Sequence, residues 1–389
     1  MLPHRFLIPN DPTLAERARR LAPFLLVGDD LADACVAAMD EELPKGSANA
    51  TLERVLREGA AVVSGLPLRV RAFFDEVEHV PAWVDFPTLD RGGDVVMRTG
   101  PVGGLVLAFK SLLHGYASPG GNKPLVFSGR LQQQAARRLN ETSRFVQATC
   151  EPGGLRSGAP GYAITVKVRL MHAKVRRMLR ASERWNTSEW GAPINQHDMA
   201  ATALLFSHVW LDGVRILGVH LSPRDNEDVM HMWRYSGHLM GVVPELQCST
   251  DREAHRLFSL VEACQAPPDD DARALVHALL FSSEQARPGD ADNRKPPPRW
   301  VAFAICRTLL GEELADALAV PRTPGTLAMP VVRRLIRTWE AVRSRVPAVD
   351  SRAAVAGRVY WDRIVAMGLG GIEAEFAMPS RLHGLPSQT

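Results

Sequence analysis

The sequence predicts an all-α protein. Apolar residues recur at three- and four-residue spacing along most of the 389-residue chain, which is the pattern of amphipathic helices. Alternating β-branched residues, which indicate strands, are scarce. The length allows two average domains or one large helical domain with additional helices.

The composition excludes several classes of protein. A formal net charge of +3 and the absence of a long basic run argue against nucleic-acid binding. Five scattered cysteines without a C-x-x-C pair argue against a disulfide framework or a thiolate zinc site and suit a reducing compartment. No secretory leader is expected, because the first 20 residues contain no apolar h-region. No membrane span is expected, because the most apolar stretch, 102–113, is broken by Lys110. We therefore expect a cytoplasmic protein, and its oligomeric state is not indicated.

Residues 1–80 are expected to form a helical extension packed on the core. Asp11 can cap a first helix over 12–26, because a short acidic side chain accepts from free N–H groups and Pro12 is tolerated at the first position. Pro23 is expected to kink this helix or end it early. Further helices are expected over 29–42, 52–63 and 67–77.

Residues 81–281 are expected to form the core. Pro81 ends the preceding helix, and a new helix covers 86–98. A small-residue apolar helix over 102–113 precedes the turn-rich loop 114–124, HGYASPGGNKP.

The helix expected over 129–150 has one apolar face with polar exceptions. Arg138 and Thr142 interrupt this face one turn apart, and Thr149 lies near its end. A buried arginine is costly unless it is paired. Arg138 therefore either meets an acid or points into a polar pocket.

The helix expected over 162–182 carries a single histidine, His172. Arg169 and Arg176 lie three residues before it and four residues after it, on the same face. Such an imidazole could ligate the iron of a haem whose carboxylates the arginines bind. A core or interfacial histidine on a basic amphipathic helix is the alternative. A short connection makes the two long helices neighbours, so Thr142 and His172 can face one cavity.

The remaining elements follow from caps and periodicity. A loop is expected over 185–195, and His197 and His208 are interpreted as structural. Ser222 can cap a helix with Pro223 at its first position. The helices expected in this part cover 196–217, 223–240, 250–262 and 269–281. Residues 282–298 are read as a linker, and 299–389 as a C-terminal helical appendage with a flexible tail.

Several kinds of catalytic motif are absent from the sequence. It has no G-x-S-x-G, no H-E-x-x-H and no pair of E-x-x-H motifs. A haem site is thus favoured partly by elimination.

The order of motifs resembles the latex-clearing rubber oxygenases and the oxygenases grouped with them. The most specific part is R-x-x-x-T at 138–142 followed one helix later by VRLMHAKVR at 168–176. The other matching stretches are PAWVD at 81–85, HGYASP at 114–119, SGRL at 128–131, TSRF at 142–145, PINQHDM at 193–199 and WRYSGHLMGV at 233–242.

The resemblance implies a globin-like helical core around one haem b, with additional N- and C-terminal helices. His172 would be the proximal iron ligand, and Arg138 and Thr142 would line the distal side. From their spacing, Arg169 and Arg176 would support the ligand or contact the haem carboxylates. Dioxygen would be the co-substrate.

This sequence departs from the rubber-cleaving members at two positions. Glu141 stands where they have a lysine that can cap the iron, and it is a possible substitute for their catalytic base. The loop upstream offers Asn122 and Lys123 where they have a glutamate. Many of those members are also secreted.

We therefore expect a haem b-dependent oxygenase that acts with dioxygen on an apolar alkene, either polyisoprene or a smaller isoprenoid. A haem protein without oxygenase activity, gas-binding or peroxidase-like, is the first alternative. A helical interaction protein without a cofactor is the second.

Overall fold

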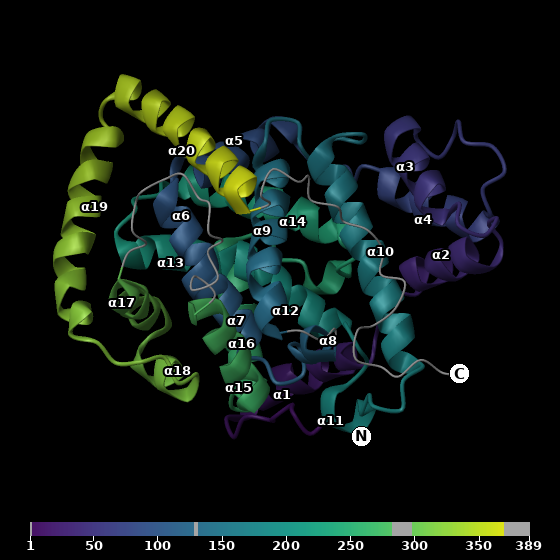
Figure 1. The fold of residues 1–389 in the computed structure, drawn as a ribbon, viewed down its shortest axis with the longest axis horizontal. Coiled ribbons are helices and arrows are strands. Elements are labelled where there is room, and N and C mark those ends of the chain that lie inside the picture. Colours follow the sequence, from purple (N-terminus) through teal and green to yellow (C-terminus); the bar gives the residue numbers. More distant parts are fainter. Residues whose placement is uncertain (1, 128–130, 282–297, 369–389) are drawn as a thin grey trace.

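The computed structural model describes residues 2–127, 131–281 and 298–368, with the backbone alone described over 131–138. In these ranges the chain forms helices and no β-strand (Figure 1). An isolated bridge joins Phe6 to Gln265. The all-α prediction is confirmed.

The N-terminal helices lie on the right of Figure 1, apart from α1 at the bottom. Asp11 caps α1 by accepting from the Leu14 N–H at 2.8 Å, and Asp29 caps α2 by accepting from Ala32 at 3.2 Å. Pro23 lies in a 3-10 turn, so the α-helix ends before it, and Gly59 at φ 86° ends α3 before the expected boundary. The bounds are α1 Pro12–Leu21, η1 Ala22–Leu25, α2 Asp30–Glu41, α3 Ala48–Glu58 and α4 Leu68–Glu78.

The central helices differ from the expected ones in three places. The loop expected over 114–124 is shorter, because helix continues to Tyr116 and resumes at Lys123. The single helix expected over 196–217 is broken at Ser207, and a short helix occupies part of the 185–195 loop. The bounds are α5 Phe86–Arg98, α6 Pro101–Val106, the π-helical η2 Leu107–Ser111, α7 Leu112–Tyr116, α8 Lys123–Phe127, α9 Leu131–Cys150, α10 Pro160–Arg180, α11 Thr187–Trp190, α12 Gln196–Phe206, α13 His208–Leu217, α14 Pro223–Leu239, η3 Pro244–Leu246, α15 Asp251–Cys264 and α16 Asp270–Phe281.

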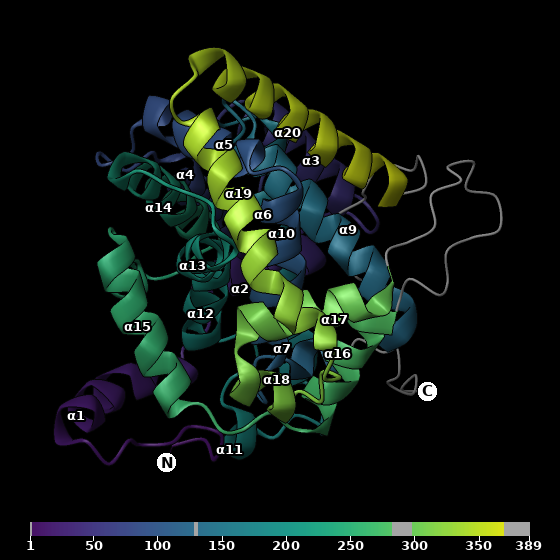
Figure 2. The ribbon, with the colours of Figure 1, turned by 90° about the vertical axis from the view of Figure 1, so that its left-hand side faces the viewer.

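The C-terminal helices wrap the left and top of the molecule (Figures 1 and 2). α20 packs across α5 and α9, and α17 packs against η2 and α13. The bounds are α17 Arg299–Leu310, α18 Glu312–Ala317, η5 Pro324–Ala328, α19 Met329–Arg343 and α20 Pro347–Gly368. The largest core cluster runs from Ala32 to Trp361 and so draws on all three helical parts.

Helix α5 lies at the centre of the packing because its glycines admit neighbours on two sides. A side chain at Gly92 would collide with the backbone of Asp228 on α14, and one at Gly93 with the backbone of Cys150 on α9. Gly357 of α20 approaches Met97 of α5 equally closely. Close contacts of this kind pack α5 directly against α9, one of the two helices that carry the predicted site.

One stretch, Gln196–Leu217, has the length and apolar composition of a membrane-crossing helix. In its most apolar window 61% is buried inside the protein, and the helix is interrupted at Ser207. The bent pair Phe86–Arg98 and Pro101–Tyr116 passes the same test only when taken together, with an angle of 87° at the break.

Candidate functional site

The predicted site residues lie on two neighbouring helices. Helix α10 carries Arg169, His172 and Arg176, and α9 carries Glu141 and Thr142. The two helices pack against each other in the middle of the molecule (Figure 1). Arg138 also belongs to α9, but its side chain lies outside the described residues.

His172 presents a buried nitrogen without a partner. Its Nδ1 is shielded from solvent and has no hydrogen-bond partner among the described residues. Burial, together with the nearby positive charge of Arg176, lowers the pKa of His172 to about 4. The imidazole is therefore neutral at pH 7, which is the form that ligates a metal.

Arg169 is fixed by a buried ion pair. Its Nε donates to Asp29 Oδ2 at 2.7 Å and its Nη2 donates to Asp29 Oδ1 at 3.2 Å, with Glu76 at 3.4 Å. The guanidinium also lies over the Phe73 ring, 5.0 Å from its centre. Because Asp29 also caps α2, this pair joins the start of α2 to the middle of α10.

Arg176 is fixed in the same way two turns further along α10. Its Nε donates to Asp33 Oδ1 at 2.8 Å, and its Nη1 donates to the Ile194 carbonyl at 3.0 Å. The side chain is fully buried. Arg180 donates to the same Asp33 at 2.8 Å.

These contacts give both arginines carboxylate partners within the protein. Of the two roles expected for Arg169 and Arg176, the geometry favours support of the helix that holds His172. Contact with haem carboxylates would require either guanidinium, itself buried, to leave the carboxylate that pairs with it, which is unfavourable.

The face of α9 beyond Thr142 meets an aromatic cluster. Glu141 and Thr142 are half-buried. One turn further, Phe145 contacts Phe206 of α12 and Trp233 of α14, with ring centres 5.6 and 5.9 Å away. Phe206 and Trp233 stack at 5.1 Å. An apolar wall thus adjoins the polar positions of α9.

Sequence reasoning missed the residues that hold this arrangement together. The Gln196 side chain donates to the carbonyls of Gly28 and Gly241 at 3.0 and 2.9 Å, and accepts from the Val243 N–H at 3.0 Å. Gly241 has φ 84°, and a side chain at this position would collide with Asp29 and Arg169. The sequence pattern raises the alternative of an acidic partner only for Arg138, and no periodicity indicates that Asp29 and Asp33 bind the arginines of α10.

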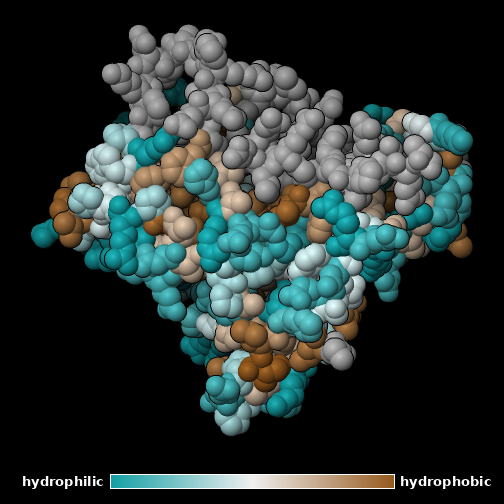
Figure 3. Space-filling view, turned by 60° about the horizontal axis from the view of Figure 1, so that its bottom comes forward, coloured by the Kyte–Doolittle hydropathy of each residue, from teal (hydrophilic) through white to brown (hydrophobic). Residues whose placement is uncertain are grey.

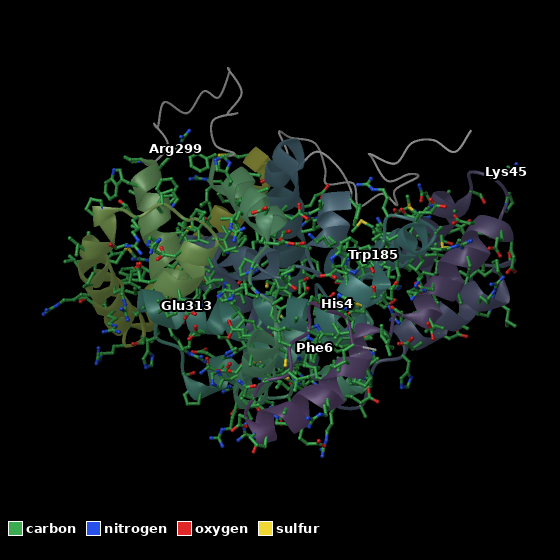
Figure 4. All side chains as sticks on the ribbon, turned by 90° about the horizontal axis from the view of Figure 1, so that it is seen from below. His4, Phe6, Lys45, Trp185, Arg299 and Glu313 are labelled. Carbon is green, nitrogen blue, oxygen red and sulfur yellow. The ribbon has the colours of Figure 1, made fainter. Side chains whose placement is uncertain are left out.

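A second buried ion pair anchors the N-terminal segment. Arg5 donates to Asp198 at 2.9 and 2.7 Å, and Asn195 caps α12 while donating to the same carboxylate at 3.0 Å. Although burial opposes it, the positive charge of Arg5 holds the pKa of Asp198 far below its usual range. Seen from below, His4 and Phe6 lie near the middle of this face (Figure 4).

The two positions upstream of α9, Asn122 and Lys123, contact residues at or just before the start of α16. Asn122 donates to the Tyr116 carbonyl at 3.1 Å, and its Oδ1 is buried without a partner among the described residues. Lys123 pairs with Asp269 at 2.7 Å and with Asp271. Neither side chain supplies a carboxylate, so the base expected from the resemblance remains unassigned.

The other histidines have contacts of their own. His197 Nδ1 lies 3.1 Å from Asp198, and His208 Nδ1 lies 2.7 Å from Asp251. Within the described ranges, no group of three or more His, Cys, Asp or Glu side chains is placed to hold a metal ion. A haem iron would need only one histidine from the protein and no such group, because the porphyrin supplies four nitrogen ligands.

An open hollow of about 270 Å³ lies between α16 and the segment 318–321 that follows α18. It is mainly apolar, and none of the predicted site residues lines it. Its lining includes Arg273, His277, Phe281 and Leu318.

The chain is similar to known proteins in sequence and in fold. The model of the family described as ER-bound oxygenase mpaB/B'/Rubber oxygenase, catalytic domain, matches residues 90–341. A rubber oxygenase of Streptomyces sp. (strain K30) is 26% identical over 317 residues, which cover 80% of this chain and 74% of that protein. The structure of latex clearing protein LCP in the closed state matches with a TM-score of 0.70 and 25% identity, over 87% of this chain and 91% of that one.

The family match extends over well more than half of the chain and includes both helices of the predicted site. The solved structure shares the helical architecture across most of both chains. The chain therefore belongs to the mpaB and rubber oxygenase catalytic-domain family and is an oxygenase.

Proposed function

We propose that the protein is a haem b oxygenase that acts with dioxygen on an apolar alkene. The observation that carries the proposal is the His172 imidazole, which is neutral and has a buried Nδ1 without a partner. A buried polar atom normally has a partner, and a proximal haem ligand is a neutral imidazole in such a position. The residues present therefore fit this cofactor.

In this proposal the ion pairs of α10 orient the ligand. Arg169 and Arg176 bracket His172 by about one turn on each side, and each binds an acid of α2 or its cap. They fix the rotation of α10 and hence the direction of the imidazole. They act as positioning residues, because neither reaches the reacting atoms.

Haem, once bound, would supply the iron that activates dioxygen. The α9 side chains would then face the developing negative charge. The hydroxyl of Thr142 and the guanidinium of Arg138 are hydrogen-bond donors, which stabilise charge on oxygen. Glu141 is the nearest carboxylate in the sequence that can accept a proton there.

The substrate class follows from the aromatic wall and from the relatives. Phe145, Phe206 and Trp233 give the neighbourhood of Thr142 an apolar surface, which suits an alkene without polar groups. The relatives are named for rubber. We propose polyisoprene or a smaller isoprenoid as the substrate, with oxidative cleavage of a C=C bond to two carbonyl ends.

Haem titration tests the cofactor and its ligand. The wild-type protein should bind haem one to one and give a Soret band, and His172→Ala should lose that band or shift it. The exposed His277, which stacks on Phe281, provides the control, so His277→Ala should behave as wild type. Added imidazole should restore the band in His172→Gly. An unchanged spectrum in His172→Ala would refute the assignment.

Product analysis tests the reaction. The haem-loaded protein should convert oligoisoprenoids in the presence of dioxygen into fragments that carry aldehyde and ketone ends, detected by mass spectrometry. ¹⁸O₂ should label the new carbonyl groups. A haem spectrum without any oxygenated product would instead favour a gas-binding or peroxidase-like protein.

A further inference from the structure

Helix α19 carries an unusual row of exposed apolar side chains. Along α19 and its two flanks, these residues recur every three or four positions on one face. They are Leu327 (82% exposed), Val331 (62%), Leu335 (66%), Trp339 (52%), Val342 (47%) and Val346 (41%). From Val331 to Val342 alone the row is about 17 Å long. Single exposed apolar residues are common, but a continuous row marks a binding surface.

The row does not arise from poor packing of the helix. The opposite face of α19 is packed on the protein through Met329, Glu340 and Arg343, which are 6%, 6% and 5% exposed. Glu340 binds Arg343 through two contacts at 3.0 and 2.9 Å and accepts from the His220 N–H at 3.2 Å. The helix is therefore held firmly while its apolar row points outward.

The position of α19 leaves this row accessible. In Figure 2, α19 crosses the face nearest the viewer, in front of α6 and α13. Hydrophobic surface is visible at the left-hand edge in Figure 3, where α19 lies in Figure 1.

The charges beside the row all have one sign. Arg334, Arg337 and Arg345 are exposed, and the first two pair with no carboxylate of the described chain. The acid of α19, Glu340, is buried and already paired. The accessible face thus combines apolar residues, a tryptophan and arginines, and α19 adds no exposed acid to it.

We propose that α19 is a docking surface for an anionic lipid bilayer. A helix that lies in a membrane interface has an apolar face with Trp and Leu and a polar face with arginines. Negative lipid head groups complement the arginines. A second copy of the chain would bring arginines against arginines, which is unfavourable. The inference goes beyond the proposed reaction and does not depend on haem.

Vesicle sedimentation with the full-length protein tests the proposal. Vesicles of phosphatidylcholine with 30% phosphatidylglycerol should bind the wild-type protein, and pure phosphatidylcholine should bind it much more weakly. Leu335→Ser with Trp339→Ser should weaken binding about tenfold or more, because each residue loses its apolar contact. Arg334→Glu with Arg337→Glu should weaken it by at least about tenfold, and salt should weaken wild-type binding.

The control variant removes exposed apolar surface elsewhere. Leu68, on α4 at the far end of the molecule, is 81% exposed, and Leu68→Ser should leave binding unchanged. Circular dichroism and the haem spectrum should be the same in all variants, so a failure of lipid binding is distinguishable from a failure of the proposed function.

Three outcomes would overturn the proposal. They are no binding of wild type to the anionic vesicles, equal binding by the α19 variants, and a wild-type dimer by light scattering that Leu335→Ser converts to a monomer.

Discussion

The buried pair of Asp29 and Arg169 should be the main stabilising link between α2 and the helix that carries His172. Asp29 is 6% exposed and Arg169 is 4% exposed. Removing one member of such a pair leaves the other charge buried, which costs about 3–5 kcal/mol. Asp29 also caps α2, and loss of a cap costs about 1 kcal/mol. Asp29→Ala should therefore destabilise the protein by about 4–6 kcal/mol.

The size of the effect can be expressed as a shift in melting temperature. A chain of this length has an unfolding entropy of roughly 0.8 kcal/mol/K near its melting point. Asp29→Ala should therefore lower the Tm by about 5–7 °C. Arg169→Met should lower it by about 4 °C or more. The neighbouring Asp30 is exposed, so Asp30→Ala provides the control and should shift the Tm by less than about 1 °C.

The double variant separates the charge pair from the cap. In the double variant, Asp29→Ala with Arg169→Met, no unpaired charge of this pair remains. Its loss in free energy of unfolding should therefore be close to the contribution of the helix cap, about 1–2 kcal/mol. Thermal melts followed by circular dichroism at 222 nm measure all four proteins. The reasoning would be refuted if the two single losses simply added in the double variant.

Two further predictions concern His114 on α7 and Gly241 beside Arg169. Burial lowers the pKa of His114 to about 3. Between pH 6.5 and pH 4 this histidine therefore takes up a proton in the unfolded chain but not in the folded protein. The free energy of unfolding should fall over this interval as the pH is lowered, by up to about 3 kcal/mol. In His114→Leu, the free energy of unfolding measured by urea titration should fall by about 3 kcal/mol less over this interval than in wild type. Parallel pH profiles of stability for the two proteins would contradict this. Gly241→Ala places a methyl group 2.5 Å from Arg169 Nε at φ 84° and should cost about 2–4 kcal/mol. Gly46, at φ 82° with nothing within 4 Å, is the control, and Gly46→Ala should cost only about 1–2 kcal/mol.

Local signals predicted the helices that have strong caps. The helix expected over 86–98 has the observed bounds, because Asp85 caps it and a Thr-Gly-Pro break follows it. The helix that begins after Ser222 was predicted for the same reason, and the structure adds a complete capping box with Asp225. Such signals act within a few residues and are readable without tertiary contacts.

The misplaced elements have causes that lie outside the local sequence. Nothing in the apolar run around Ser207 indicates a break, since it contains no proline and no nearby glycine before Gly213. The π-helical turn at Leu107–Ser111 is similarly unmarked, although Lys110 there reaches the Leu309 carbonyl at 2.9 Å. The π-helical turn therefore involves a residue about 200 positions away in the sequence, which local signals cannot show.

The positions of the α10 residues were predictable from the sequence, but their binding partners were not. Spacing placed Arg169, His172 and Arg176 on one face of α10, as observed. It did not show that Asp29 and Asp33, more than a hundred residues earlier, would bind the two arginines. A buried charge requires a partner of opposite charge, but only the fold determines which residue that partner is.

The position of α20 sets the order in which the protein can be completed during synthesis. Trp361 of α20 is 1% exposed, and Arg358 binds Asp94 of α5 and Glu151 at the end of α9. The surfaces of α5 and α9 therefore stay uncovered until almost the whole chain has left the ribosome. The roughly 250 residues between Arg98 and Pro347 take about 10–50 s to translate at about 5–20 residues per second. During that interval the nascent chain presents an apolar face that chaperones can bind, and a stop codon before α20 would leave it exposed permanently.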